Sequence, residues 1–436
     1  MTSEWKRVTV SEVCELIVDC VNKTAPVVEK PTPYKMLRTT NIKGGRIDRE
    51  ECRRVSKDTF VKWTRRADVR RGDVILTREA PLGEVGYVDF ADTVFLGQRL
   101  MQYRANPALL EPRFLLYSFL SKDLQNQFGA HEGSGSTVSH IRVGDCSKFE
   151  LSLPPLSTQR AIASVLGALD DKIELNRRMN ATLEEMARAL FQSWFVDFDP
   201  VRAKLDGRQP AGMDAETAAL FSDHFEHGEH DMLPVGWRLA AVEEVCAINS
   251  WTLGKNDDLE TLEYVEISEV SRGNIANIAS YPRGEEPSRA RRRLRHGDTV
   301  LSTVRPDRGA YFLAMNPPGN RVASTGFAVL TPTAVPWSFI HAALTHPEVS
   351  DHLGQMADGG AYPAVRPEII GAMKVALPNE PKILKAFHQI CAPLFEQSEA
   401  NRIQSRTLST LRDKLLPKLL SGELSVRKMN AEETSV

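Results

Sequence analysis

The chain has 436 residues, enough for two or three domains with their own hydrophobic cores, which excludes a peptide hormone and a lone recognition module. Hydrophobic residues make up 42% of the chain and charged residues 26%, close to the average for globular proteins, so wholesale disorder is not expected. The 55 Lys and Arg nearly balance the 57 Asp and Glu, and a nucleic-acid surface would therefore need local segregation of charge.

The cysteines and the N-terminal residues favour a reducing, intracellular setting. The six cysteines lie far apart and form no C-x-x-C pair, which argues against a disulfide framework. Residues 1–7 lack the apolar stretch of a signal peptide, and no run reaches the ~18 apolar residues of a membrane span. We therefore expect a soluble, cytoplasmic protein.

The sequence contains an internal repeat. Gly72–Leu76 matches Gly297–Leu301, Phe149–Pro154 matches Met373–Pro378, and other short matches keep the same order at an offset of about 225 residues. Each copy begins with short apolar runs separated by Gly, Pro, Asn and Asp and ends in a long stretch with helical spacing. The pattern predicts an α+β fold with a pseudo-twofold repeat. The expected parts are a globular domain at 1–155, a long helix at 156–196, an acidic linker at 197–231, a second globular domain at 232–380, a second long helix at 381–424 and a tail at 425–436.

The two long helices carry apolar residues in alternating steps of three and four, the spacing of a coiled-coil seam. Two like helices with incomplete apolar stripes bury themselves best against each other, and a pseudo-twofold arrangement makes them antiparallel. Asn176 and Asn401 would then face each other, whereas Pro393 and Pro417 predict a break or kink. The alternative is that each helix packs only on its own globular domain. The expected seam residues are Leu166, Leu169, Ile173, Asn176, Leu183, Leu394, Asn401 and Leu408.

This order of globular unit and long helix, given twice, resembles the specificity subunit of type I restriction–modification systems. The resemblance covers nearly the whole chain and is carried by Leu153–Leu166, Leu169–Asn176, Leu190–Val201 and Leu411–Leu424. It implies two target-recognition domains that each read one half of a bipartite DNA sequence, with the helices keeping them a fixed distance apart. It also implies docking of two methyltransferase subunits and of restriction (translocase–nuclease) subunits, with S-adenosylmethionine in the methyltransferase and no cofactor in this chain.

Because the two globular units differ in sequence, their half-sites should differ, and the target should be asymmetric. Residues 1–155 carry 24 Lys and Arg and 20 Asp and Glu, whereas residues 232–380 carry 14 Lys and Arg and 17 Asp and Glu. The second unit concentrates its positive charge in Arg289–His296, a segment suited to phosphate contacts or, alternatively, to a solvated face.

Several loops carry side chains that can reach base edges or phosphates. Arg78 follows an expected strand, and Arg305 and Arg308 occupy the matching loop of the second copy; an ordinary surface turn is the alternative. The Gly-rich and Ser-rich loops near residues 133–142 and 359–366 either approach phosphates or serve as flexible connections. The full candidate set for DNA contact is Arg38, Thr39, Asn41, Lys43, Arg78, Gln98, Arg99, Ser136, Thr137, His140, Arg142, Arg291, Arg292, Arg293, Arg305, Arg308 and Tyr362.

A second hypothesis is that the chain is an adenine methyltransferase acting on its own. Asn316-Pro-Pro-Gly319 resembles the methylation motif, but glycine stands where an aromatic residue would stack on the flipped base, so a turn is favoured. No catalytic or metal site is predicted; His224 and His227 could ligate a metal, yet a solvated acidic linker fits better. Trp194 and Phe195 end the first helix and either dock a methyltransferase or become buried within this chain.

Overall fold

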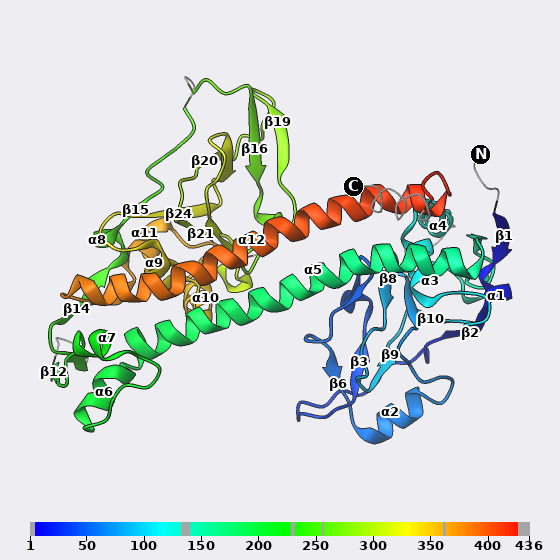
Figure 1. The fold of residues 1–436 in the computed structure, drawn as a ribbon, viewed down its shortest axis with the longest axis horizontal. Helices are drawn as coiled ribbons and strands as arrows, with labels where there is room; N and C mark the ends of the chain where they lie inside the picture. The colour runs from blue at the N-terminus through cyan, green and yellow to red at the C-terminus, as the bar shows by residue number, and fades with distance from the viewer. Residues whose placement is uncertain (1–4, 132–139, 228–231, 255–256, 361–362, 426–436) are drawn as a thin grey trace, which may run out of the picture. The chain divides into compact units, whose positions relative to one another are not determined.

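The computed structural model describes residues 5–131, 140–227, 232–254, 257–360 and 363–425. The chain forms two compact units (Figure 1). Unit 1 comprises residues 1–174 and 406–436, and unit 2 comprises residues 175–405. Among the described residues, none of the helices combines the length and the apolar character that a bilayer crossing needs.

Unit 1 is built on a four-stranded antiparallel sheet in the order β2-β10-β7-β8, with a three-stranded sheet β6-β3-β9, the hairpin β4-β5 and the pair β1-β11. Helices α3 and α4 pack on the main sheet and bury their apolar faces there. The strands are β1 (Lys6–Thr9), β2 (Cys14–Asp19), β3 (Lys35–Leu37), β4 (Ile42–Lys43), β5 (Arg46–Ile47), β6 (Arg53–Arg54), β7 (Val74–Arg78), β8 (Leu82–Tyr87), β9 (Val94–Leu96), β10 (Leu100–Ala105) and β11 (Glu150–Leu153). The helices are α1 (Val10–Val13), η1 (Thr39–Asn41), α2 (Lys57–Trp63), α3 (Pro112–Leu120), α4 (Lys122–Gly129) and η2 (Val143–Asp145).

Unit 2 repeats this plan. Its main sheet has the order β15-β24-β21-β22, its second sheet the order β19-β16-β23-β20, and β14 pairs with β25 as β1 pairs with β11. The strands are β14 (Trp237–Ala241), β15 (Cys246–Ile248), β16 (Thr261–Val265), β17 (Val270–Ser271), β18 (Asn274–Ile275), β19 (Ala279–Pro282), β20 (Ala290–Arg293), β21 (Asp298–Ser302), β22 (Tyr311–Ala314), β23 (Arg321–Ser324), β24 (Phe327–Pro332) and β25 (Lys374–Pro378). The helices are α8 (Val242–Val245), η4 (Ile267–Glu269), η5 (Pro306–Arg308), α9 (Trp337–Leu344), α10 (Pro347–Gln355) and α11 (Pro367–Ala372).

Short-range contacts show why the two copies fold alike. The carboxylate of Glu12 accepts a hydrogen bond from the Thr9 amide, and that of Glu244 accepts one from the Ala241 amide, each at 2.7 Å, which caps a short helix in both units. The aspartates of the repeated Gly-Asp pairs, Asp73 and Asp298, are buried and each accepts a backbone hydrogen bond from the preceding turn. The internal repeat predicted from the sequence is confirmed.

The long helices are α5 (Leu156–Phe191) and α12 (Pro381–Leu420). In unit 1, Leu166 of α5 and Leu419 of α12 are fully buried in one core, and Arg412 of α12 forms an ion pair of 2.7 Å with Asp170 of α5. In unit 2, the amide nitrogen of Asn180 donates to the Ser398 carbonyl at 3.0 Å. In both units a later residue of α5 meets an earlier residue of α12, so the antiparallel packing is confirmed and the alternative of two separate helices is wrong.

A buried polar layer joins the two helices within unit 2. Asn176 and Asn401 are 0% and 4% exposed, and the Asn176 side-chain nitrogen donates to the Asn401 carbonyl at 3.3 Å and to Gln404 at 2.8 Å. The Asn401 side-chain nitrogen donates to Asn180 Oδ1 at 2.9 Å. The predicted meeting of Asn176 and Asn401 is therefore confirmed. A single polar layer of this kind fixes the register of a helix pair.

Helix α12 is continuous from Pro381 to Leu420 through both of its prolines, so of the predicted break or kink the break is wrong. Pro393 and Pro417 are exposed, and so are Gln389 and Asp413, whose carbonyls lose their helical donor at each proline. Water can hydrate these carbonyls, which keeps the loss of one hydrogen bond per proline tolerable.

The segment expected to be a solvated acidic linker is folded. It contains η3 (Gln192–Val196), α6 (Asp199–Leu205), α7 (Ala215–Ala219), β12 (Phe225–His227) and β13 (Met232–Pro234). Phe198, Val201 and Phe221 belong to the main core of unit 2. The acidic residues of this segment that the structure describes are exposed, so the overall negative charge of the sequence hid its apolar inner face.

Trp194 and Phe195 are 4% and 3% exposed and lie in the same core, so they do not form an exposed docking site. Trp237, from the strand that opens the second copy, packs on Phe195 with ring centroids 5.7 Å apart. The alternative of burial within the chain is the correct one. The side chain of His224 lies 2.5 Å from that of Asp223, and no metal-ligating cluster occurs among the described residues.

Candidate nucleic-acid interface

In unit 1, three turns meet at one edge of the sheets. Strands β3 and β9 are parallel, so the residues that follow them, Arg38 and Gly97, leave the sheet on the same side. The Arg78 amide donates to the Arg99 carbonyl at 2.8 Å, and the Thr39 hydroxyl donates to the Ala80 carbonyl at 2.9 Å. We call this surface the first loop edge, formed by Arg38, Thr39, Arg78, Gln98 and Arg99.

The guanidinium groups of the arginines in the first loop edge use only part of their hydrogen-bonding capacity within the chain. Arg78 donates through Nη1 to the Ile141 carbonyl at 3.0 Å, and Arg38 donates through Nη2 to the Glu51 carbonyl at 3.0 Å, while the Nε atom of each has no hydrogen-bond partner in the described structure. Arg99, whose side chain is 51% exposed, lies 3.4 Å from Glu79. An exposed pair of this kind contributes little, so a phosphate or a guanine edge can replace Glu79.

Other predicted residues of unit 1 have different roles. Asn41 is 3% exposed and its side-chain oxygen accepts the Arg38 amide at 2.9 Å, so it caps the turn instead of reading bases. Lys43 and Arg142 are exposed, and Arg142 is brought close to the first loop edge because the Ile141 amide donates to the Arg78 carbonyl at 2.9 Å. His140, which directly precedes Ile141 in the chain, is partly buried. Ser136 and Thr137 lie outside the described residues.

Unit 2 has an equivalent edge, but its residues differ from the predicted ones. The Thr303 amide donates to the Gly326 carbonyl and the Val365 amide donates to the Thr303 carbonyl, each at 2.9 Å, which reproduces the contacts of Arg78 in unit 1. Thr303 is therefore the counterpart of Arg78, and the predicted Arg305 and Arg308 lie farther along the same matching loop, between β21 and β22. Arg305 precedes η5 with a left-handed backbone (φ 46°), and Arg308 within η5 is exposed. Tyr362 lies outside the described residues.

The two edges carry opposite charge at one matched position. Glu266 follows β16 as Arg38 follows β3, and it is exposed. Gly326 stands where unit 1 has Arg99. We call Glu266, Thr303, Thr325 and Gly326 the second loop edge. The offset of about 225 residues leads from Arg38 to Glu263, three residues before Glu266. The registers of the two parallel strand pairs, and not the offset, identify Glu266 as the counterpart.

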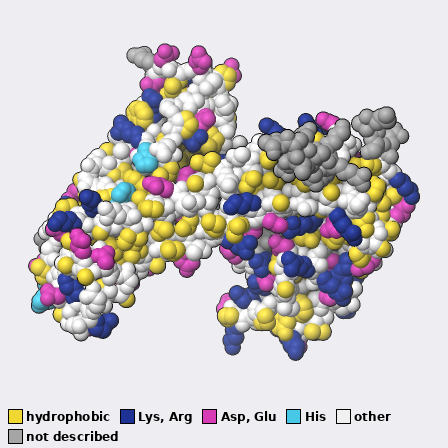
Figure 2. Space-filling model, viewed as in Figure 1, with side chains coloured by type: hydrophobic (Ala, Val, Ile, Leu, Met, Phe, Trp, Pro, Cys, Tyr) yellow, Lys and Arg dark blue, Asp and Glu magenta, His cyan; other side chains and the backbone are white. Residues whose placement is uncertain are grey.

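The arginine-rich strand β20 is partly engaged within unit 2. Arg293 forms an ion pair of 3.0 Å with Asp257, and its guanidinium lies 4.1 Å from the ring centre of Trp251, so a role for Arg293 in phosphate contact is not supported. Arg291 donates to the Ser288 carbonyl at 3.2 Å. Arg292 has a buried Nε with no hydrogen-bond partner among the described residues, and burial lowers the pKa of its guanidinium. Lys and Arg are interspersed with Asp and Glu over the visible face of both units (Figure 2).

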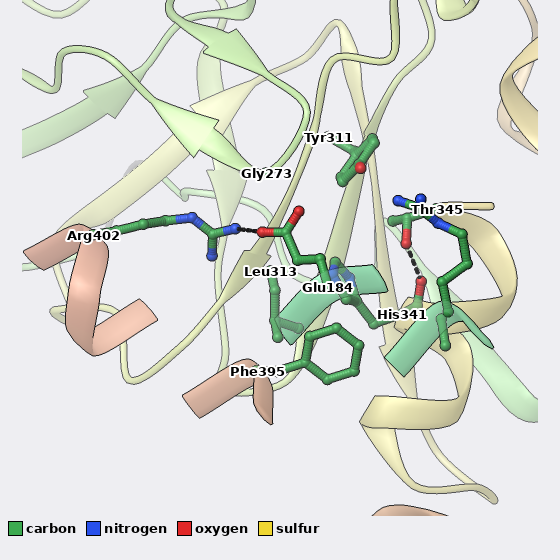
Figure 3. Close-up of a pocket in the computed structure, with 10 residues that line it drawn as sticks. Glu184, Gly273, Tyr311, Leu313, His341, Thr345, Phe395 and Arg402 are labelled. Atoms are coloured by element: carbon green, nitrogen blue, oxygen red, sulfur yellow. Dashed lines mark hydrogen bonds and ion pairs between the residues drawn. The ribbon is translucent and has the colours of Figure 1, made fainter. Parts of the chain in front are cut away.

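A small cavity lies between the long helices and the main sheet of unit 2 (Figure 3). Its volume is about 20 Å³, and it is lined by an ion pair between Arg402 and Glu184 and by Tyr311, His341 and Phe395. Burial and, to a smaller extent, the positive charge of Arg402 lower the pKa of His341 to about 3. This space suits about one water molecule, which excludes a cofactor at this place.

Asn316-Pro-Pro-Gly319 forms the turn between β22 and β23, as predicted. The Arg321 amide donates to the Pro318 carbonyl at 2.9 Å, and the Asn316 amide donates to His296 Nδ1 at 3.3 Å. Asn316 adopts a left-handed conformation (φ 44°), which suits a tight turn.

Comparisons with known proteins agree with this architecture. The family model for the type I restriction modification DNA specificity domain matches residues 2–185. The HindI specificity subunit of Haemophilus influenzae is 26% identical over 408 residues, covering 82% of this chain and 87% of the relative. The MjaIX specificity subunit of Methanocaldococcus jannaschii is 22% identical over 365 residues, covering 82% of this chain and 79% of the relative. The chain is therefore similar to type I restriction–modification specificity subunits over most of its length.

The fold of this chain is also that of a solved structure. The S subunit of a type I system from M. genitalium covers 95% of this chain and 96% of its own length, with a TM-score of 0.53 and 17% identity. The predicted fold class, a mixed α+β architecture with two recognition domains and two long antiparallel helices, is thereby confirmed. In this family the specificity subunit is the non-catalytic DNA-recognition component, and the matches give no support to a methyltransferase acting on its own.

Proposed function

We propose that this specificity subunit reads an asymmetric, two-part DNA sequence, with one part read by the first loop edge and the other by the second loop edge. The observation that carries the proposal is the difference between the edges: Arg38, Arg78 and Arg99 of unit 1 match Glu266, Thr303 and Gly326 of unit 2. A guanidinium fork suits guanine O6 and N7 or a phosphate, whereas a carboxylate accepts from the amino group of cytosine. The two half-sites should therefore differ.

The proposal includes methyltransferase subunits, which bind S-adenosylmethionine, and restriction subunits as partners. An exposed apolar stripe on α5 supports a docking role for the long helices. Leu175, Met179 and Met186 are 43%, 37% and 53% exposed, and their spacing of four and seven residues puts them on one helical face. An unpartnered stripe of this kind suits the apolar face of a partner helix.

Mapping of methylated bases tests the proposal. The chain is co-expressed with its cognate methyltransferase subunit in a host that lacks other methylation, and methylated positions in the genome are located. We expect two different short motifs at a constant separation, and no methyl transfer by either protein alone. Methyl transfer by this chain without the partner, or methylation at a single continuous palindrome, would refute the proposal.

A further inference from the structure

A groove in unit 1 lies beside the first turns of α5 and the end of α12. Its volume is about 410 Å³. Trp5, which is only partly buried, forms one wall, and the other walls come from both long helices and from the turn after α12. The residues that matter here are Trp5, Thr158, Ala161, Ile162, Leu419 and Leu424. A groove of this size can hold a large aromatic side chain together with its neighbours.

The internal repeat shows how the same place is covered in unit 2. Trp5 and Trp237 are equivalent, because each stands four residues before the amide that is capped by Glu12 or by Glu244. Trp237 is 6% exposed. Three rings cover it, with centroid distances of 5.7 Å for Phe195, 5.4 Å for Phe198 and 6.4 Å for Phe221. The remaining groove beside Trp237, about 290 Å³, is lined partly by Leu220 and Val235 of the same covering segment.

Unit 1 lacks these covering rings. At the helix offset of 225 residues, Leu419 stands in place of Trp194, Leu420 in place of Phe195, and Glu423 in place of Phe198. Leucines close the core, since Leu419 is 0% exposed, but Trp5 contacts no aromatic ring among the described residues. Residues 1–4 and 426–436, which lie outside the described residues, contain no Phe, Trp or Tyr.

We propose that this groove, the Trp5 groove, receives an aromatic side chain of the methyltransferase subunit, in the way that Phe195, Phe198 and Phe221 cover Trp237. The identity of the partner rests on the proposed function; the aromatic character of the occupant rests on the repeat. Aromatic side chains supply large buried area and favourable edge-to-face contacts, and they are enriched among the residues that dominate protein interfaces.

The first test measures whether the Trp5 groove accepts an aromatic ring. The full chain is labelled with 5-fluorotryptophan, the Trp5 signal is assigned in the ¹⁹F spectrum from Trp5→Phe, and indole is the probe. We expect indole to shift the Trp5 signal saturably. Ala161→Phe, which fills the groove, should abolish the shift, whereas Ser164→Phe, on an exposed position of the same helix, should leave it unchanged. An unshifted Trp5 signal would overturn the proposal.

The second test measures partner binding. Binding of the cognate methyltransferase subunit to Ala161→Phe should be at least 10-fold weaker than to Ser164→Phe, at matched thermal midpoints of the two variants. Equal binding by both variants would overturn the inference and leave the proposed function intact, whereas no binding by the unaltered chain would refute the proposed function itself.

Two other occupants have their own signatures, and either would overturn the proposal. If residues 426–436 fill the groove, their deletion alone moves the Trp5 signal and allows indole to bind. If a second copy of the chain fills it, the chain forms a concentration-dependent dimer that Ala161→Phe abolishes.

Discussion

Replacement of Asn401 by Ala perturbs the buried polar layer between the long helices in unit 2. The substitution removes the 2.9 Å hydrogen bond from Asn401 to Asn180 Oδ1 and the 3.0 Å hydrogen bond from Gln397 to Asn401. Asn180 is 9% exposed, so its oxygen loses its donor without gaining water, at about 1–3 kcal/mol, and the partly buried Gln397 adds about 1 kcal/mol. We expect the free energy of unfolding of unit 2 to fall by about 2–4 kcal/mol.

Urea denaturation followed by tryptophan fluorescence measures this loss, because four of the six tryptophans belong to unit 2. The matched control is the double variant Asn180→Leu/Asn401→Leu, which removes both members of the Asn401–Asn180 hydrogen bond and should cost less than Asn401→Ala, because it leaves no Asn180 oxygen without its donor. That control should also loosen the helix register, so that methylated motifs appear at more than one separation. A loss below about 0.5 kcal/mol for Asn401→Ala, or an equal loss in the apolar double variant, would refute the assigned role of this layer.

Three further predictions concern the loop edges and the core of unit 2. Arg99→Ala should weaken binding of the cognate duplex by about 5- to 150-fold at fixed salt, whereas Arg160→Ala on α5 should change it little; equal effects would remove Arg99 from the interface. Glu266→Gln should relax base preference in one half-site only, which methylation mapping detects; a change in both halves, or in neither, would contradict the assignment. The pKa of His341 is about 3 in the folded state and about 6.5 in the unfolded state, so the free energy of unfolding should decrease as the pH falls below about 6.5, by about 2 kcal/mol at pH 5. Denaturation at pH 7 and at pH 5 measures this loss, and a His341→Phe variant should lack it.

Features that depend on spacing along the chain could be predicted from the sequence. The offset of about 225 residues led to the matched sheets, and the three-and-four spacing led to the antiparallel helices. The contact between Asn176 and Asn401 followed from the repeat, because equivalent residues of two antiparallel helices must meet at their crossing. These inferences did not require the tertiary contacts between individual side chains to be known.

Features that depend on tertiary contacts could not be predicted. Trp194 and Phe195 look exposed at a helix end, and only the return of the chain at Trp237 buries them. Asn41 has the chemistry of a base reader, but its oxygen is used by a backbone amide three residues earlier. The loop of Arg305 and Arg308 could be matched to the loop of Arg78, but the exact counterpart of Arg78 is Thr303, which only its backbone hydrogen bonds define.

In each unit the parallel strand pair, β3-β9 or β16-β23, marks the boundary between the hydrophobic core and the exposed loop edge. Leu37 and Val265 at the strand ends are fully buried, whereas the next residues, Arg38 and Glu266, reach the surface. A substitution at the residue directly after the strand, Arg38 or Glu266, can therefore change the preferred base without disturbing the hydrophobic core. Duplicated copies of such a unit are free to diverge in what they select while remaining interchangeable in architecture.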